Sequence, residues 1–165
     1  MATTATSCPG CGLEGPASGQ VYDRKFNASA ACWSVFEGVI AAEFQNRALF
    51  GRAHQLTVDT YAVQHAGGRH PDKSVCIHAV GLCLVLDRGV PPNDVPRRLQ
   101  RLAGRTTDWP HFDVPAERAS STVRDVALAA GAVDEHVRRV REWASQVWTC
   151  WKPHHAAIRG VGDGL

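Results

Sequence analysis

The chain has no long apolar run and almost no net charge, and these two absences exclude several classes of protein. The longest apolar stretch, around residues 77–86, is too short to cross a bilayer and is interrupted by His78, so we expect a buried helix and no membrane partner. The formal charge of +2 is too balanced to predict a nucleic-acid partner. The first residues are few and polar and show no signal-peptide pattern, so we expect a cytoplasmic protein.

Strand-like alternation, internal repeats and low-complexity segments are also missing. Hydrophobic residues make up 44% and charged residues 21% of the chain, which is typical of a globular protein. A length of 165 residues suits one domain. We therefore predict an all-α fold in which residues 1–29 form an arm and loop and residues 30–159 form a bundle of five or six helices. The sequence does not indicate an oligomeric state.

Helical periodicity defines the expected elements. Trp33, Phe36, Ile40 and Phe44 recur at three- and four-residue steps, which predicts a helix over 30–49 that ends at Gly51. The segment 105–119 shows no such pattern and reads as a functional loop. Further helices are expected over 52–65, over 72–88 with Asp72 as N-cap, over 95–103, from a capping box at Thr122 to Gly131, and from an N-cap at Asp134 to Pro153.

Cysteine, in contrast, is plentiful, and three of the six cysteines lie near the start of the chain. Cys8 and Cys11 belong to the run CPGCG, and Cys32 opens the first helix. A Cys-x-x-Cys turn of this kind is typical of a zinc knuckle. Because a second such pair is missing, a redox dithiol and free thiols remain alternatives. The other three thiols are expected in the core and not in disulfides: Cys76, Cys83 and Cys150.

A histidine is expected to complete the metal site. If the first two helices form an antiparallel hairpin, His65 returns to the level of Cys32, whereas His54 lies near the opposite end. We therefore predict a zinc ion bound by Cys8, Cys11, Cys32 and His65, with His54 as the alternative fourth ligand. A Cys₃His site has no open position and is normally structural.

A second group of polar residues is expected inside the bundle. His78 should lie near Tyr61, Asp59 or His65, either as a hydrogen-bonded core partner of Asp59 or as part of a working site. His155 follows Trp151 by four residues and is expected in the interior. The remaining histidines, His70, His111 and His136, are expected on the surface, and Trp143, Trp148 and Trp151 in the core.

Several of these motifs together resemble an uncharacterised bacterial family, one of the domains of unknown function. The likeness extends over almost the whole chain, and the string HxLTVDxYAxQH at residues 54–65 is its most specific part. The resemblance implies that the motifs form one unit but implies no activity. The other motifs are CPGCG, Cys32-Trp33, the run VGLCLVL from Val80, and WKPHH ending at His155.

The sequence leaves two functions open and favours the first of them. In the first, the protein is a small metal-dependent hydrolase or lyase acting on a small molecule, with Asp59, Tyr61, His78 and His155 as catalytic residues and the loop 105–119 at the rim of a pocket. In the second, it is a non-catalytic, zinc-stapled helical module that binds a protein or nucleic acid. A basic helix would then make the contact through Arg97, Arg98, Arg101 and Arg105, although such a patch is more typical of a solvated face.

Overall fold

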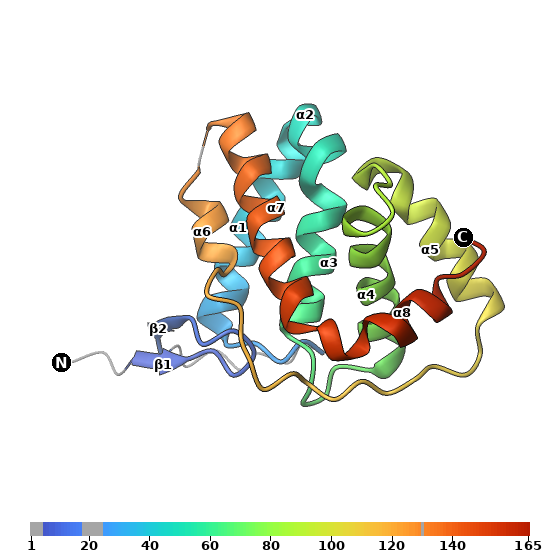
Figure 1. Ribbon diagram of the computed structural model, residues 1–165. Helices are drawn as coiled ribbons and strands as arrows, with labels where there is room; N and C mark the ends of the chain where they lie inside the picture. The colour runs from blue at the N-terminus through green and yellow to red at the C-terminus, as the bar shows by residue number, and fades with distance from the viewer. Residues whose placement is uncertain (1–4, 18–24, 130) are drawn as a thin grey trace.

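The computed structural model describes residues 5–17, 25–129 and 131–165. Five helices of ten residues or more, within these residues, form a bundle that agrees with the predicted all-α fold (Figure 1). They are α1 (Ala30–Gln45), α3 (Gln55–Gln64), α4 (Asp72–Leu86), α5 (Val95–Arg105) and α7 (Val133–Cys150). Shorter elements connect them: α2 (Arg47–Leu49), α6 (Val123–Ala127), α8 (His155–Val161), the π-helix η1 (Phe50–His54), and the 3₁₀ helices η2 (Pro92–Asp94) and η3 (Lys152–His154).

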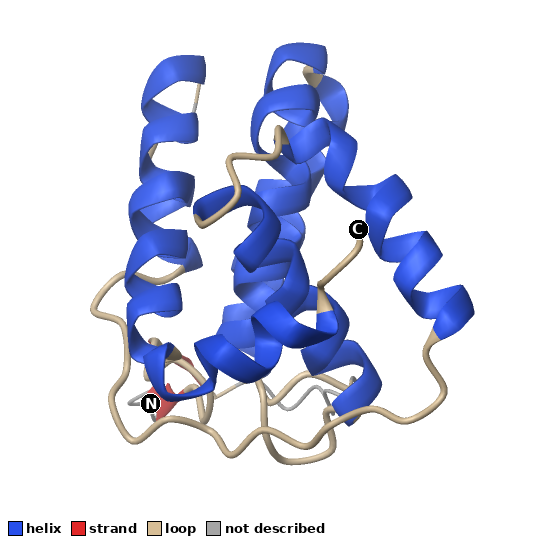
Figure 2. Cartoon of the chain, turned by 45° about the vertical axis from the view of Figure 1, so that its right-hand side comes forward, coloured by secondary structure: helices blue, strands red, loops and turns tan. Residues whose placement is uncertain are grey.

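Helices α3 and α4 form the centre of the bundle. Helices α1, α6 and α7 lie on one side of this pair, and α5 and α8 lie on the other (Figures 1 and 2). The central position of α4 follows from its sequence, because apolar side chains cover nearly its whole circumference, and its residues from Ala79 to Val85 are all buried. No helix in the described part of the chain is both long enough and apolar enough to span a membrane.

The predicted boundary between the first two helices is wrong by several residues. Helix α1 ends at Gln45, because Asn46 adopts an extended conformation and its side chain accepts hydrogen bonds from the backbone N–H groups of Ala48 and Leu49. Asparagine favours this cap over a helix interior. Gly51 does not end a helix; it lies inside the π-helix η1, which leads directly into α3.

The caps predicted for the other helices are confirmed in part. Thr122 and Asp125 form a capping box at the start of α6. Asp134, by contrast, is not an N-cap: α7 already begins at Val133, and the Asp134 carboxylate instead accepts a hydrogen bond from Arg52 at 2.8 Å. Asp72 is likewise the first residue of α4 and not its cap.

A small β-hairpin precedes the helices and was not predicted. Strands β1 (Ala5–Ser7) and β2 (Glu14–Pro16) pair antiparallel around the Cys-x-x-Cys turn. Their sequences, ATS and EGP, show no alternation of apolar and polar residues. The closed turn between the strands brings their backbones together. Because the pairing does not depend on alternating apolar side chains, the sequence shows no strand pattern.

The core agrees in part with the expected apolar stripes: Phe36 is buried, but Phe44 is 64% exposed and its neighbour Glu43 is buried instead. Trp143, Trp148 and Trp151 are buried, as predicted. Cys76 and Cys83 are buried too, whereas Cys150 is half-buried at the end of α7. The segment after α5 is irregular up to α6, as expected, and crosses one end of the bundle (Figure 1).

Candidate metal centre

The first two ligands are placed by a tight turn between the strands. The backbone N–H of Cys8 donates to Leu13 O at 2.9 Å, and that of Gly12 donates to Cys8 O at 2.8 Å. Gly12 has φ +78°, a conformation that favours glycine. These bonds close the turn, so the side chains of Cys8 and Cys11 lie on the same side of it and are both buried.

The third ligand lies in the first turn of α1. Ser29 is the N-cap of this helix, and its hydroxyl accepts a hydrogen bond from the Cys32 N–H at 3.2 Å. The backbone N–H of Ser29 in turn donates to Cys8 Sγ at 3.4 Å. The start of α1 therefore fixes Cys32 and supports the sulfur of Cys8 as well.

The fourth ligand, His65, is the C-cap of α3. Its Nδ1 lies 2.7 Å from Tyr61 O, and because a carbonyl only accepts, Nδ1 carries the hydrogen. Nε2 is then free to bind a metal, and it lies 3.4 Å from Cys32 Sγ. This is the outer-shell arrangement that metal-binding histidines commonly have.

The four ligand atoms have the spacing of a tetrahedral site. All lie within 4.8 Å of one another, and the Cys11 and Cys32 sulfurs are 3.7 Å apart. Zinc bonds of about 2.3 Å to sulfur and 2.0 Å to nitrogen give ligand separations of about 3.8 Å and 3.5 Å. The cysteines are free thiols. The predicted clustering of Cys8, Cys11, Cys32 and His65 is confirmed, and these residues fit a metal ion.

The charges of the three thiols depend on one another. Hydrogen bonds from Cys11 and Cys32 hold the pKa of Cys8 well below its ordinary value. A hydrogen bond with Cys32 lowers the pKa of Cys11, but its contact with Cys8 and its burial outweigh this and raise it to about 12. Contacts with Cys11 and Cys8, and burial, raise the pKa of Cys32. Binding of a divalent ion must therefore displace protons from Cys11 and Cys32, and it is favoured by higher pH.

Aromatic and imidazole rings pack around the centre. Tyr61 is fully buried, stacks on Phe36 and on His65 with ring centroids 3.9 and 4.0 Å away, and donates from its hydroxyl to Cys32 Sγ at 3.6 Å. His70, which was expected on the surface, is buried and donates from Nδ1 to His65 O at 3.1 Å. Burial lowers the pKa of His70 to about 4, so it stays neutral beside the centre.

Gly10 is the point of closest approach between the turn and the helical hairpin. A Cβ atom at this position would lie 2.6 Å from the His65 ring and 2.5 Å from Asn27 O. We expect Gly10→Ala to push the turn away from His65 and to weaken zinc binding by about 10- to 100-fold, as loss of outer-shell support does. Competition with a zinc chelator measures this. Gly38→Ala is the matched control, because a Cβ there meets no atom within 4 Å, and equal affinities in the two variants would contradict the prediction.

The remaining predicted site residues lie in separate places. His78 Nδ1 donates to Asp59 Oδ1 at 2.7 Å, which confirms their expected proximity. Asp59 is fully buried, and burial raises its pKa; its Oδ2 has no hydrogen-bond partner among the described residues and would lie 2.2 Å from a Cβ at Gly81. His155 stacks on Trp148 and bonds to Trp148 O at 2.8 Å.

His54, the alternative fourth ligand, is not part of the metal cluster. Its Nδ1 lies 2.9 Å from a carboxylate oxygen of Glu43, which is fully buried. The same carboxylate accepts from Thr57 Oγ1 at 2.6 Å and from Nε2 of His136 at 2.8 Å. His136 was expected on the surface but is buried, whereas His111 is exposed as expected.

This carboxylate network was missed, although the sequence contains a signal for it. Glu43 follows Phe36 and Val39 on the buried face of α1, and His136 precedes Val140 and Trp143 on the buried face of α7. A charged side chain in an apolar stripe is rarely buried without a partner. Two such residues on different helices indicate a shared polar network.

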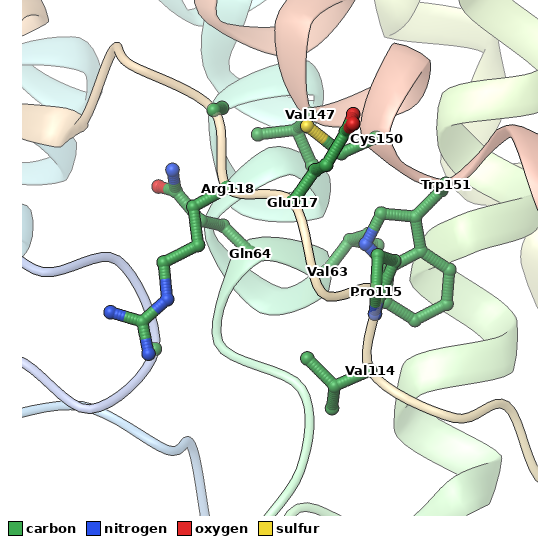
Figure 3. Close-up of a pocket in the computed structure, with 11 residues that line it drawn as sticks. Val63, Gln64, Val114, Pro115, Glu117, Arg118, Val147, Cys150 and Trp151 are labelled. Atoms are coloured by element: carbon green, nitrogen blue, oxygen red, sulfur yellow. The ribbon is translucent and has the colours of Figure 1, made fainter.

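The loop after α5 does rim a pocket, as expected. This pocket lies between the loop and the ends of α3 and α7, next to Gly10, and has a cavity of about 30 Å³ (Figure 3). Its lining includes Gln64, Arg118 and Cys150 but none of Asp59, Tyr61, His78 and His155. Arg118 donates to Pro9 O at 3.0 Å, so the loop contacts the turn between Cys8 and Cys11.

A family model matches residues 6–152 of the chain, and the chain belongs to this family, which is described as a family of unknown function (DUF5946). The resemblance to an uncharacterised family is thereby confirmed. Comparison with curated proteins and with solved structures gives no match.

Proposed function

We propose that this member of the DUF5946 family is a zinc protein in which one ion, bound by Cys8, Cys11, Cys32 and His65, fastens the N-terminal hairpin to α1 and α3. The observation that carries the proposal is the convergence of four buried ligand atoms within 4.8 Å. Three thiolates and one imidazole form a ligand set that zinc prefers. The bound ion would supply the positive charge that keeps three adjacent sulfurs deprotonated.

The geometry supports a structural role for this ion. Four protein ligands complete a tetrahedral shell, and none of the four residues is more than 6% exposed. No position is left in such a shell for a water or a substrate. Of the two functions left open by the sequence, the geometry therefore favours the zinc-stapled helical module.

The positions of the expected catalytic residues support the same conclusion. Asp59 and His78 form a pair between α3 and α4, Tyr61 packs at the sulfurs, and His155 packs on Trp148. A hydrolase or lyase reaction would need these groups to converge on one substrate. In the basic helix, Arg98 and Arg105 donate to the backbone carbonyls of residues 165 and 163, so these two side chains contact the last residues of the same chain.

Elemental analysis of the protein purified without added metal tests this proposal. We expect one zinc per chain. Exchange for cobalt should give the absorption bands of a tetrahedral, thiolate-bound ion, and these bands should not change when small anions that bind open metal positions are added. A fully folded chain without metal would contradict the proposal, and bands that shift on addition of an anion would contradict a structural role.

Removal of zinc should loosen the hairpin and leave the centre of the bundle intact. Apart from the ion, the turn is held by few bonds, among them Arg118 to Pro9 O and Arg124 to Glu14 O at 2.8 Å. At free zinc about 100 times its Kd, we expect chelation to speed amide exchange at residues 8–13 by about 100-fold. Hydrogen exchange followed by mass spectrometry measures this. Equal acceleration in α4, which serves as the internal control, would show that the ion supports the whole fold.

A further inference from the structure

A groove runs between α1, α6 and the start of α7, and none of the metal ligands lines it. Its cavity of about 330 Å³ is comparable to a small ligand site. The walls are mostly apolar and come from small side chains, including Val35, Gly38 and Ala42 of α1 and Val126 of α6. Figure 1 shows these three helices side by side.

The groove contains one imidazole, that of His136. Nε2 of this residue lies 2.8 Å from Glu43, and Nδ1 has no partner among the described residues. His136 is only 5% exposed. Among the described residues, Asp59 Oδ2 is the one side-chain oxygen or nitrogen that is fully buried and has no hydrogen-bond partner. Nδ1 of His136 has no partner either, so it is not fully buried. His136 is one of the residues that line the groove.

The Glu43 carboxylate determines which nitrogen of His136 carries the hydrogen. Burial alone would raise the pKa of Glu43, but the hydrogen bonds from His136, His54 and Thr57 outweigh it and lower the pKa. An ionised carboxylate only accepts, so Nε2 of His136 is the donor. In the neutral ring, Nδ1 then has a free lone pair. The hydrogen bonds that Glu43 accepts from three other elements hold its carboxylate in place, and this fixes the direction of the lone pair on His136.

We propose that this groove binds a small, largely apolar molecule with one hydroxyl group, which donates a hydrogen bond to Nδ1 of His136. The apolar walls take the body of the molecule, and the single acceptor selects for the hydroxyl. Gly38 leaves the floor open, because a Cβ there meets no atom within 4 Å. This site is independent of the proposed zinc centre.

Phenol and toluene form a matched pair of probes, since they differ mainly in the hydroxyl group. In NMR titrations of the zinc-loaded protein, we expect phenol to shift the amide signals of α1 and α6 around the groove and the ring nitrogens of His136. Toluene should bind at least about fivefold more weakly, because it cannot make the hydrogen bond. Equal affinity for the two probes, or no shifts in the groove, would overturn the proposal.

Three variants, one of them a control, keep the test independent of folding. Gly38→Leu fills the groove and should abolish the phenol shifts, whereas Gly104→Leu, at another open helix position, should not. His136→Lys keeps a donor to Glu43 and has no acceptor atom, so it should remove the preference for phenol. If Gly38→Leu binds phenol like the unchanged protein, the groove is not the site.

Discussion

Replacing Cys32 with serine should abolish zinc binding and release the N-terminal hairpin from α1 and α3. Cys32 is the central ligand: its sulfur lies 3.7 Å from Cys11 Sγ, 3.4 Å from His65 Nε2 and 3.6 Å from the Tyr61 hydroxyl. A hydroxyl does not replace a thiolate at a zinc site. We expect no bound zinc and a loss of about 3 kcal/mol in the free energy that holds the hairpin in place, as after chelation at 100 times the Kd.

Cys150→Ser is the matched control for this variant. It makes the same chemical change at a half-buried cysteine outside the metal cluster, so zinc content should stay at one per chain. Metal analysis and denaturant unfolding, carried out side by side on the two variants, provide the comparison. Full zinc content in the Cys32→Ser protein would show that the ion is not bound as we propose.

Replacing Glu43 with glutamine should destabilise the bundle almost as strongly. The carboxylate accepts three hydrogen bonds, from His54, Thr57 and His136, and it is fully buried. A glutamine of the same shape turns one acceptor oxygen into an NH₂ group that faces donors. Leaving buried polar groups unpaired costs about 3 kcal/mol. Denaturant unfolding measures the loss, and zinc content should remain unchanged.

The same variant should also change the response to acid. The pKa of Glu43 is lowered in the folded protein, so its contribution to stability is present above its ordinary value of 4.5 and is lost as the pH falls through the lower, folded value. Stability of the Glu43→Gln protein should therefore fall less steeply over this acidic range. Glu117→Gln, at an exposed position in the loop, is the control, and a slope identical to that of the unchanged protein would contradict the prediction.

The clustering of the four candidate ligands could be predicted from the sequence, because it depends on the spacing of residues within one turn and one helical hairpin. The spacing of Cys8 and Cys11 fixes a turn, and helical rise along the hairpin places His65, and not His54, at the level of Cys32. These arguments placed His65 correctly beside Cys32, although the boundary between the first two helices was predicted incorrectly. The extra turn at Asn46 and the π-helix lie at the far end of the hairpin, so they left the returning end in register.

The contacts of Glu43 could not be predicted from local spacing, because the residues of this network meet only through tertiary packing. Glu43 and His136 are 93 residues apart, and no local pattern relates α1 to α7. His70 and His136 were expected on the surface because neither was recognised as part of an apolar stripe, yet a backbone carbonyl and a carboxylate hold them inside. Long-range hydrogen bonds of this kind override simple polarity.

All four proposed ligands belong to the first 65 residues, and this order has a consequence for biosynthesis. The site is complete once α3 has emerged from the ribosome, before α7 has been made. A nascent chain can then capture its ion while the later helices are still being translated. Zinc would thereby join the two ends of the first hairpin early and give the rest of the bundle a preformed surface on which to assemble.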